Sequence, residues 1–296
     1  MKLREDLSTI GFIGTGVMGN SMAKNLLNAG YSVSVHTRTK SKANELVEEG
    51  ATWRNSVADL ASESNVIITM VGYPHDVEEV YFGEKGIIEN AMPNSYVIDM
   101  TTSSPTLARK IYESVLSRKI HSLDAPVSGG DIGARSGKLA IMVGGEREAF
   151  EAVKPIFVVM GENIILQGKA GSGQHTKMCN QIAIASNMIG VCEAIVYAEK
   201  AGLDPSRVLK SITTGAAGSW SLSNLAPRMI TGDFEPGFYI KHFIKDMSIA
   251  LEAAKEMDML TPGLELSLSL YKSLAEQGEE ERGTQALIKW FQSNSV

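Results

Sequence analysis

Three glycines near the start of the chain have the spacing of a phosphate-binding turn. Gly14, Gly16 and Gly19 form a G-x-G-x-x-G pattern that follows an apolar run and opens an amphipathic segment. In such a turn the first glycine permits the bend, the second lets the backbone approach a pyrophosphate, and the third lets the helix pack closely on the strand. The helix N-terminus favours the anion through its free N–H groups and its dipole. The pattern therefore predicts a bound dinucleotide.

Two further stretches suit a small carboxylic acid. Asp124-Ala-Pro-Val-Ser-Gly-Gly ends in a turn, from Ser128 onward, that can offer consecutive backbone N–H groups to a carboxylate. The second stretch places Lys177 one turn into a long predicted helix. Asn180 and Gln181 follow three and four positions later and so share its face. We expect the two stretches together to hold a small acid between two domains.

The elements that position these residues follow from the hydrophobic pattern. Strands are predicted at residues 9–13, 32–36, 65–69, 96–99, 120–123, 139–143 and 164–166, with helix-like segments between most of them. This alternation predicts βαβ units around a mostly parallel sheet. After Gly168 the pattern is helical, at residues 176–200, 205–212, 240–257, 263–276 and 284–291. The sequence therefore predicts an α/β, Rossmann-type doubly wound domain over residues 1–168, and a long helix leading into an all-α domain over residues 169–296.

Size and composition agree with an ordinary soluble globular protein. A chain of 296 residues favours two domains, and 44% hydrophobic with 21% charged residues is typical of globular proteins. A net charge of −6 without a long basic run argues against nucleic acid as a partner. The longest apolar stretch, residues 182–198, is shorter than a membrane span and predicts a buried helix. The charged N-terminus and two cysteines too far apart to bridge, Cys179 and Cys192, predict a cytoplasmic protein.

The residues after the second strand bear on the choice of dinucleotide. NAD-binding proteins usually place an acid about 20 residues after the glycines, whereas NADP-binding proteins need a cation for the 2′-phosphate. Here Thr37, Arg38 and Thr39 follow the strand, and no acid is present. The planar guanidinium of Arg38 suits a phosphate, so we expect NADP, with NAD possible. The alternative is that Arg38 and the lysines after it only form the solvated start of a helix.

Other chemistries find less support in the sequence. His175 and Cys179 stand four positions apart, but two ligands without a third nearby do not make a metal site, so none is expected. The five histidines show no arrangement with a serine nucleophile, and there is no G-x-S-x-G elbow.

The motifs together resemble those of a known family. The glycine turn, the stretch at residues 124–130, the G-x-G-x-x-x-K pattern at residues 171–177 and the pair Lys245-Asp246 have the order and spacing found in the β-hydroxyacid dehydrogenases. That family includes 3-hydroxyisobutyrate dehydrogenase, tartronate semialdehyde reductase and the glyoxylate/succinic semialdehyde reductases. The resemblance runs from about residue 9 to beyond residue 265.

The resemblance implies a role for each matching residue. The catalytic residue is Lys177, and the substrate-binding residues are Ser128, Gly129, Gly130, Asn180 and Gln181. The cofactor contacts are Gly14, Thr15, Gly16, Val17, Met18, Gly19, Thr37, Arg38, Met70, Thr102 and Lys245. Gln181 stands where several members have a second asparagine, which leaves its hydrogen bond to the substrate open. Gly283-Thr-Gln285 lacks the acid that members often carry, so we assign it no role.

The implied reaction is hydride transfer between NADP(H) and a small β-hydroxyacid or its semialdehyde. Lys177 would protonate the developing alkoxide during reduction and take the hydroxyl proton during oxidation. A free lysine has a pKa of ~10.4, and burial in a closed cleft lowers such a pKa. An imine reductase and a non-catalytic NADP-binding module that senses redox state remain alternatives, as do several semialdehyde substrates. We expect a homo-oligomer, a dimer or tetramer, and leave the roles of Asp246 and Trp220 open.

Overall fold

The computed structural model describes residues 9–294 of a chain that divides into two compact units. Unit 1 is Met1–Lys177 and unit 2 is Met178–Val296. The division lies inside helix α9 (Ser172–Lys200), nine residues after the boundary predicted at residue 168 (177 against 168). The difference arises because the first turns of α9 pack within unit 1, through contacts described below.

Unit 1 is built on one twisted sheet. Its strands are β1 (Thr9–Ile13), β2 (Ser32–His36), β3 (Thr52–Trp53), β4 (Val66–Thr69), β5 (Tyr96–Asp99), β6 (His121–Asp124), β7 (Val127–Ser128), β8 (Leu139–Gly145) and β9 (Gly161–Gly168). Their order is β3-β2-β1-β4-β5-β6-β8-β7, with β9 beside β8. The pairs from β3 to β6 are parallel, whereas β8 runs antiparallel to β6 and β7. The mostly parallel sheet is confirmed; β3 and β7 went unpredicted because two residues show no alternation.

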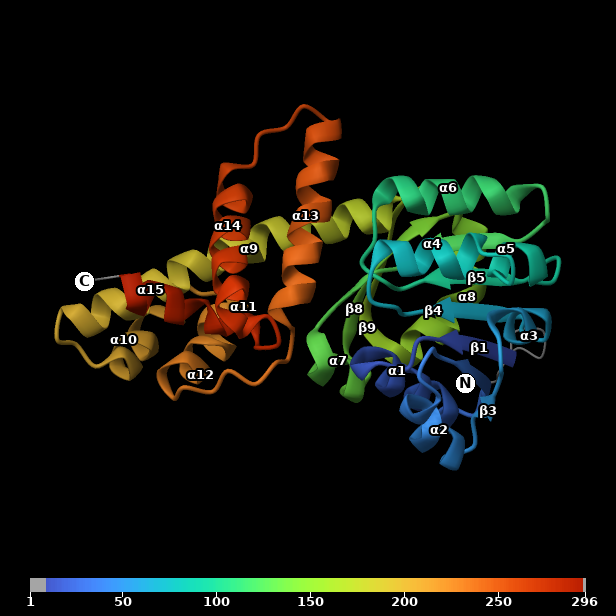
Figure 1. Cartoon of the computed structure of the whole chain (residues 1–296), viewed down its shortest axis with the longest axis horizontal. Coiled ribbons are helices and arrows are strands. Elements are labelled where there is room, and N and C mark those ends of the chain that lie inside the picture. The colour runs from blue at the N-terminus through green and yellow to red at the C-terminus, as the bar shows by residue number, and fades with distance from the viewer. Residues whose placement is uncertain (1–8, 295–296) are drawn as a thin grey trace. The chain divides into compact units, whose positions relative to one another are not determined.

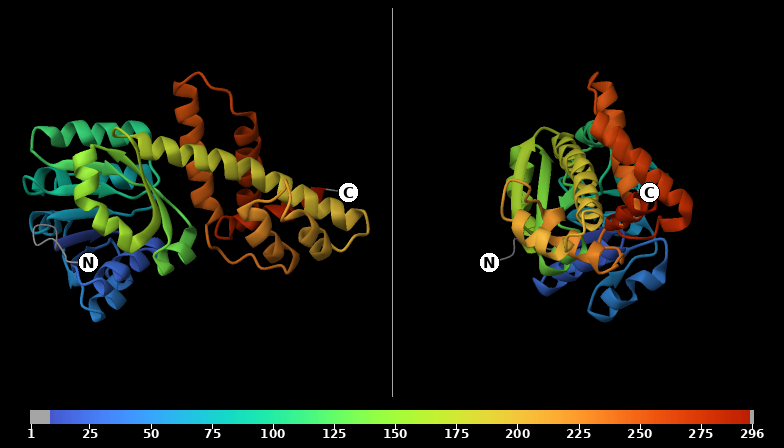
Figure 2. Two further views of the ribbon diagram at one scale, coloured as in Figure 1. Left: turned by 180° about the vertical axis from the view of Figure 1, so that it is seen from behind. Right: turned by 90° about the vertical axis from the view of Figure 1, so that its left-hand side faces the viewer.

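Helices cover both faces of this sheet (Figures 1 and 2). They are α1 (Val17–Asn28), α2 (Asn44–Glu48), α3 (Val57–Ser62), α4 (Pro74–Phe82), α5 (Ile87–Asn90), α6 (Pro105–Leu116), α7 (Gly130–Ser136) and α8 (Arg147–Met160), with a 3-10 turn at Lys40–Ala43. Successive strand residues point to opposite faces. In β4, Ile68 joins the core under α1 and α8, whereas Ile67 joins the core under α3, α4 and α6. This is the doubly wound arrangement that the sequence predicts.

Unit 2 is helical, as predicted. After the first part of α9 it contains α10 (Pro205–Ile212), α11 (Trp220–Asn224), α12 (Ala226–Ile230), α13 (Ile240–Glu256), α14 (Pro262–Leu274) and α15 (Ile288–Asn294), with a π-helical stretch at Ala275–Glu279 and a 3-10 turn at Thr284–Leu287. Its core joins α9, α13 and α14 around Cys192, Phe243 and Tyr271. Trp220, whose role the sequence left open, begins a short helix: Ser219 accepts a hydrogen bond from the N–H of Leu222 (3.0 Å) and caps it.

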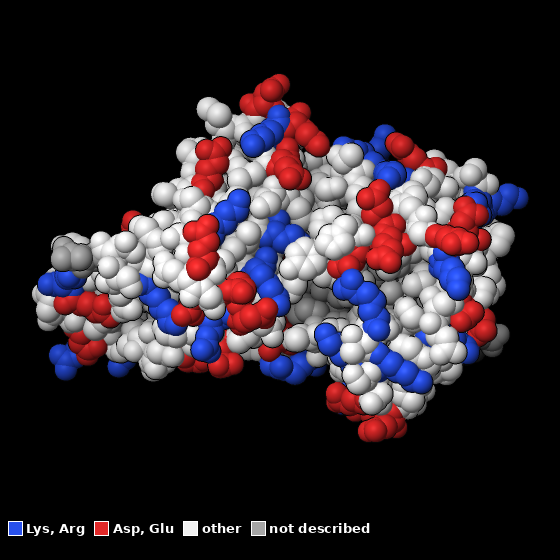
Figure 3. All heavy atoms as spheres, in the orientation of Figure 1, with Lys and Arg blue, Asp and Glu red and all other residues white. Residues whose placement is uncertain are grey.

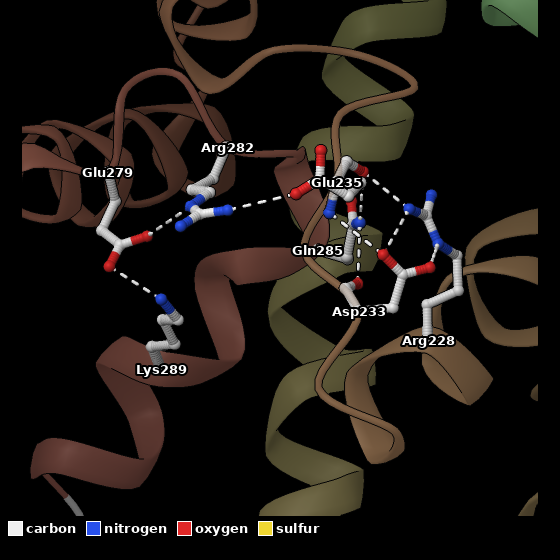
Figure 4. A network of polar contacts seen from close by, with 7 residues as sticks. All are labelled: Arg228, Asp233, Glu235, Glu279, Arg282, Gln285 and Lys289. Atoms are coloured by element: carbon white, nitrogen blue, oxygen red, sulfur yellow. Dashed lines mark hydrogen bonds and ion pairs between the residues drawn. The ribbon is translucent and has the colours of Figure 1, made fainter.

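A polar network in unit 2 joins α12 and the segment after it to residues between Glu279 and Lys289 (Figure 4). The amide of Gln285 is buried and donates to the carbonyl oxygens of Asp233 (3.1 Å) and Glu235 (3.0 Å). Arg228 binds the carboxylate of Asp233 with Nε and Nη2, and Arg282 lies 3.3 Å from the carboxylate of Glu235. Gln285, to which the sequence assigned no role, therefore holds the segment between α12 and α13 in place.

The long helix α9 meets the length and composition of a membrane span, with a mean hydropathy of 1.4 in its most apolar window. Half of that window is buried in the structure, and core helices of soluble proteins meet the same criterion. Cys179 and Cys192, both on this helix, are free thiols.

Candidate active site

The predicted cofactor residues of unit 1 gather at one edge of the sheet. In a doubly wound sheet a ligand lies beyond the carboxyl ends of the strands, where the strand order reverses. That point lies between β1 and β4. Gly14 follows the end of β1, Thr37 follows β2, Met70 follows β4 and Thr102 comes shortly after β5. Lys245, the remaining predicted contact, lies on α13 of unit 2.

The three glycines of the turn have different physical reasons to be glycine. Gly14 has φ = +97°, which disfavours a side chain, and a Cβ there would overlap the carbonyl oxygen of Met70. A Cβ on Gly19 would overlap the carbonyl oxygen of Gly14, so α1 packs directly on the turn. A Cβ on Gly16 would meet nothing within 4 Å. The first and third glycines are thus required by the fold, and the second leaves the approach to the backbone open.

The same turn fits a dinucleotide. Gly16 caps α1 without a side-chain hydrogen bond, and the first turn of α1 carries no acid, so an anion meets free N–H groups and no opposing charge. The hydroxyl of Thr15 is buried and has no hydrogen-bond partner among the described residues. Buried polar atoms seldom stay unpaired, which indicates a ligand at this hydroxyl. Residues 14–19 would therefore hold the pyrophosphate of a nicotinamide dinucleotide, which supplies the hydride chemistry when bound.

Arg38 is anchored by an acid that the sequence analysis did not single out. One guanidinium nitrogen of Arg38 lies 2.8 Å from Oδ1 of Asp76, and the Arg38 side chain is 78% exposed while Asp76 is buried. The other oxygen of Asp76 accepts the N–H of Tyr73 (3.0 Å) at the start of α4. Asp76 thus orients the guanidinium through one nitrogen and compensates part of its charge. An acid three residues after the N-cap of a predicted helix was the available signal.

Lys177 reaches the predicted substrate loop within unit 1. Its ammonium donates a hydrogen bond to the carbonyl oxygen of Val127 (2.9 Å), and only 7% of the residue is exposed. Val127 directly precedes Ser128 in β7. Gly129 and Gly130 follow with φ of +129° and +62°, conformations that side chains disfavour. The structure therefore brings the predicted acid/base beside residues 128–130, although they are 47 or more positions apart (177 − 130 = 47).

The start of α9 is held by two side chains that the sequence analysis missed. Asp124, the last residue of β6, accepts the N–H of Gly171 at Oδ1 (2.7 Å) and the N–H of Gln174 at Oδ2 (2.8 Å). The buried amide of Gln174 donates to the carbonyl of Thr101 (2.7 Å) and accepts from the N–H of Ser103 (3.0 Å). These contacts explain why unit 1 extends to Lys177. The only available signal was the position of Asp124 at the head of the stretch 124–130.

Two neighbouring strands end in buried carboxyl groups. Asp99 of β5 and Asp124 of β6 are partners in register. Burial raises the pKa of Asp99 to about 6, although hydrogen bonds from Thr69 and Thr101 favour its ionised form. Burial also raises the pKa of Asp124, against the hydrogen bonds from the amides of α9. The acid side chains at this edge are therefore held by polar contacts from adjacent segments rather than by solvent.

In unit 2 the two predicted substrate amides are not equivalent. The amide nitrogen of Asn180 donates to Oε1 of Gln181 (2.7 Å), and the amide nitrogen of Gln181 donates to Oδ2 of Asp246 (2.6 Å). The ammonium of Lys245 lies 3.0 Å from the other oxygen of Asp246. Gln181 is fully buried, whereas Asn180 is half-buried. Because an ionised carboxylate only accepts, Asp246 fixes which way the Gln181 amide points, and Gln181 in turn orients Asn180.

Among residues 9–294, no three His, Cys, Asp or Glu side chains are grouped as metal ligands. His175 lies in the part of α9 that belongs to unit 1, and Cys179 lies in the part that belongs to unit 2. The expectation that the protein needs no metal stays a prediction.

Comparison with known proteins extends over nearly the whole chain. Residues 9–168 match the model for the NAD-binding domain of 6-phosphogluconate dehydrogenase, and residues 171–291 match the model for the NAD-binding domain of NADP-dependent 3-hydroxyisobutyrate dehydrogenase. The chain is 68% identical to the uncharacterized oxidoreductase YkwC of Bacillus subtilis (strain 168) over 281 residues, 95% of this chain and 98% of the relative.

Two further relatives carry functional names. The 2-hydroxy-3-oxopropionate reductase of Escherichia coli (strain K12) is 40% identical over 280 residues, 95% of this chain and 96% of the relative. The structure of 3-hydroxyisobutyrate dehydrogenase of Mycobacterium tuberculosis with L-serine superimposes with a TM-score of 0.88 at 31% identity, covering 96% of this chain and 98% of that one.

Proposed function

The chain belongs to the β-hydroxyacid dehydrogenase family, and we therefore propose that it transfers a hydride between NADP(H) and a small β-hydroxyacid or its semialdehyde, with Lys177 as general acid and base. Membership makes the protein an NAD(P)-dependent oxidoreductase that acts on a CH–OH group. One observation carries the assignment of Lys177: its buried ammonium lies 2.9 Å from the carbonyl of Val127, beside the loop 128–130.

The proposed roles divide between binding and proton transfer. The backbone N–H groups of Ser128, Gly129 and Gly130 bind the substrate carboxylate. Lys177 donates a proton to the developing alkoxide in reduction, and takes the hydroxyl proton in oxidation. Asn180, almost one helical turn further along α9, hydrogen-bonds the substrate. Gln181, whose amide is engaged with Asn180 and Asp246, orients Asn180 instead of contacting the substrate.

The preference for NADP rests on Arg38. No acid follows β2, and the exposed fork of Arg38 suits a 2′-phosphate. Asp76 already pairs with one guanidinium nitrogen of Arg38, so the preference for NADP over NAD is moderate and the protein also uses NAD.

The names of the relatives support the substrate class. One is a 2-hydroxy-3-oxopropionate reductase, and the other is a 3-hydroxyisobutyrate dehydrogenase whose structure includes L-serine. Each name or ligand describes a small acid that bears a hydroxyl group. We propose the same class here, with glyoxylate and the semialdehydes of tartronate, succinate and methylmalonate as candidates.

Oxidation of NADPH by the purified protein against these four compounds tests the proposal, with NADH alongside. Lys177→Ala lowers kcat by about 10²- to 10⁴-fold, because proton transfer to the alkoxide loses its donor, while NADPH still binds. Lys200→Ala, an exposed lysine at the far end of α9, is the matched control and keeps full activity. Tight binding of NADPH without turnover of any compound would instead favour an imine reductase or a redox-sensing module.

We also propose a cytoplasmic homo-oligomer that binds neither nucleic acid nor a membrane. Unit 2 leaves large apolar side chains exposed, among them Tyr197, Trp220 and Leu260, which a second copy would cover. Figure 3 shows basic and acidic side chains interspersed over the face that it draws, which suits a small substrate better than a polyanion. Light scattering of the purified protein tests the oligomer, and a monomeric mass would refute it.

A further inference from the structure

We propose that Asp124 is a positioning residue for Lys177: its carboxylate caps the start of α9 and thereby holds the lysine ammonium at the carbonyl of Val127. The catalytic consequence rests on the proposed function, whereas the position of Lys177 can be tested without it. All the groups involved lie within unit 1.

The cap uses both oxygens of the carboxylate. The first N–H groups of a helix have no partner within the helix. Asp124, 4% exposed, binds the N–H of Gly171 at 2.7 Å with one oxygen and the N–H of Gln174 at 2.8 Å with the other. Hydrogen bonds from N–H groups to an ionised carboxylate are stronger than neutral ones. One side chain therefore fixes both the position and the direction of the first turn of α9.

The packing around the cap leaves no space for a looser arrangement. A Cβ on Gly144 of β8 would lie 2.5 Å from Oδ1 of Asp124 and 2.7 Å from the nitrogen of Gly173. A Cβ on Gly173 would lie 2.6 Å from the carbonyl oxygen of Asp124. The helix start thus rests directly on the ends of β6 and β8, where the backbones approach without intervening side chains.

The cap and the partner of the lysine belong to one short segment. Val127, whose carbonyl receives the Lys177 hydrogen bond, comes three residues after Asp124. Lys177 comes three residues after Gln174, less than one helical turn. A shift of the helix start by about 1 Å would therefore move the ammonium away from its partner, and misplacement of that size can cost about 10²-fold in rate. Gln174 adds a second tie, to the loop Thr101–Ser103 that contains the predicted cofactor contact Thr102.

Asp124→Asn tests this role, because the side chain keeps its shape while one oxygen becomes an amide nitrogen. That nitrogen donates and cannot accept, so it faces an N–H of α9 without a bond. The main measurement is the rate at which acetic anhydride labels Lys177, read by peptide mass spectrometry. We expect labelling to rise about tenfold or more over the wild type, and kcat to fall about 10- to 100-fold with the NADPH dissociation constant within about twofold.

Ser56→Ala is the matched control. Ser56 caps α3 of the same unit by accepting the N–H of Asp59 (3.1 Å), and it lies 68 positions before Asp124 (124 − 56 = 68). Loss of that cap lowers the melting temperature but leaves Lys177 labelling and kcat at wild-type values. If Asp124→Asn also lowers only the melting temperature, Asp124 merely stabilises the fold and the inference is overturned.

Two other experimental outcomes are also informative. If the wild type turns over none of the substrates, the proposed function fails, but labelling of Lys177 still reports on its position. If Asp124→Asn does not fold, hydrogen exchange of the wild type tests the cap of α9 instead. The amides of Gly171 and Gln174 are expected to exchange as slowly as those in the interior of α9, and exchange as fast as at an uncapped helix end overturns the cap.

Discussion

The glycine turn at residues 14–19 and the surroundings of Lys177 are assembled in opposite ways. In the turn, the residues that determine the backbone are neighbours: Gly14 adopts a positive φ and Gly19 packs on its carbonyl. Lys177 instead depends on Val127, 50 positions away, and the helix that carries it depends on Asp124 and Thr101, up to 73 positions away. A cofactor turn can therefore be recognised from local spacing, whereas the surroundings of the proposed acid/base are created by long-range polar contacts.

Gly19→Ala should produce the largest effect on the turn. Its Cβ would overlap the carbonyl oxygen of Gly14, so we expect a loss of about 3 kcal/mol or more in the free energy of unfolding, and weaker NADPH binding. Gly16→Ala is the matched variant, because its Cβ meets nothing within 4 Å. It should change stability by less than about 0.5 kcal/mol while weakening NADPH binding. Urea unfolding and cofactor titration measure both, and equal stability losses would contradict the distinction between the two glycines.

The pH dependence of stability tests a buried carboxyl group, Asp99, that contacts from other segments hold in place. The pKa of Asp99 is raised from 3.8 to about 6 in the folded state, so the native protein holds this proton more tightly than the unfolded chain. Asp99 therefore stabilises the folded state most at low pH. Its contribution to the free energy of unfolding falls by about 3 kcal/mol as pH rises from about 4 to about 6. Asp99→Asn removes this loss. The stability of the variant relative to wild type should rise between pH 4 and pH 7, and a constant difference in urea unfolding would refute the raised pKa.

Arg38→Gln tests whether the choice between NADP and NAD depends only on residues that are close in sequence, as the backbone of the glycine turn does. Loss of a charged hydrogen-bond donor to the 2′-phosphate should raise KM for NADPH by about 10- to 100-fold and leave KM for NADH nearly unchanged. Asp76→Asn should shift the ratio only a few-fold, because it frees the guanidinium without removing it. Steady-state kinetics with both cofactors measure the ratio. A large effect of Asp76→Asn would mean that the preference depends on α4 as much as on the end of β2.

Gln181→Leu should have a smaller effect than Arg38→Gln. The amide orients Asn180 and binds Asp246, so its loss should raise KM for the substrate about fivefold, while kcat changes less. Gln285→Leu is a control, since this buried amide also binds within unit 2 but serves only the segment after α12. A collapse of kcat in Gln181→Leu would indicate that Gln181 itself contacts the substrate.

The sequence by itself determined those features that depend on neighbours along the chain. The alternation of strand-like and helix-like segments predicted the parallel sheet, the helical pattern after residue 168 predicted unit 2, and the glycine spacing predicted the turn, because backbone conformation and periodic burial are local properties. Two-residue strands such as β7 and the short helix at Trp220 were missed, since they carry too few residues for a period.

Only the tertiary structure decided which polar groups meet. Gln174 has no local feature that marks it as a partner of the loop before α6, and Asp124 is marked only by its place at the head of residues 124–130, which does not predict that it caps α9. Gln181 could not be distinguished from Asn180 by position on a helix face. Their partners lie on other segments, and buried polar groups must find partners wherever the fold brings them. Local sequence motifs thus contain the residue types of the proposed site, whereas the orientation of those residues depends on contacts that exist only once the chain has folded.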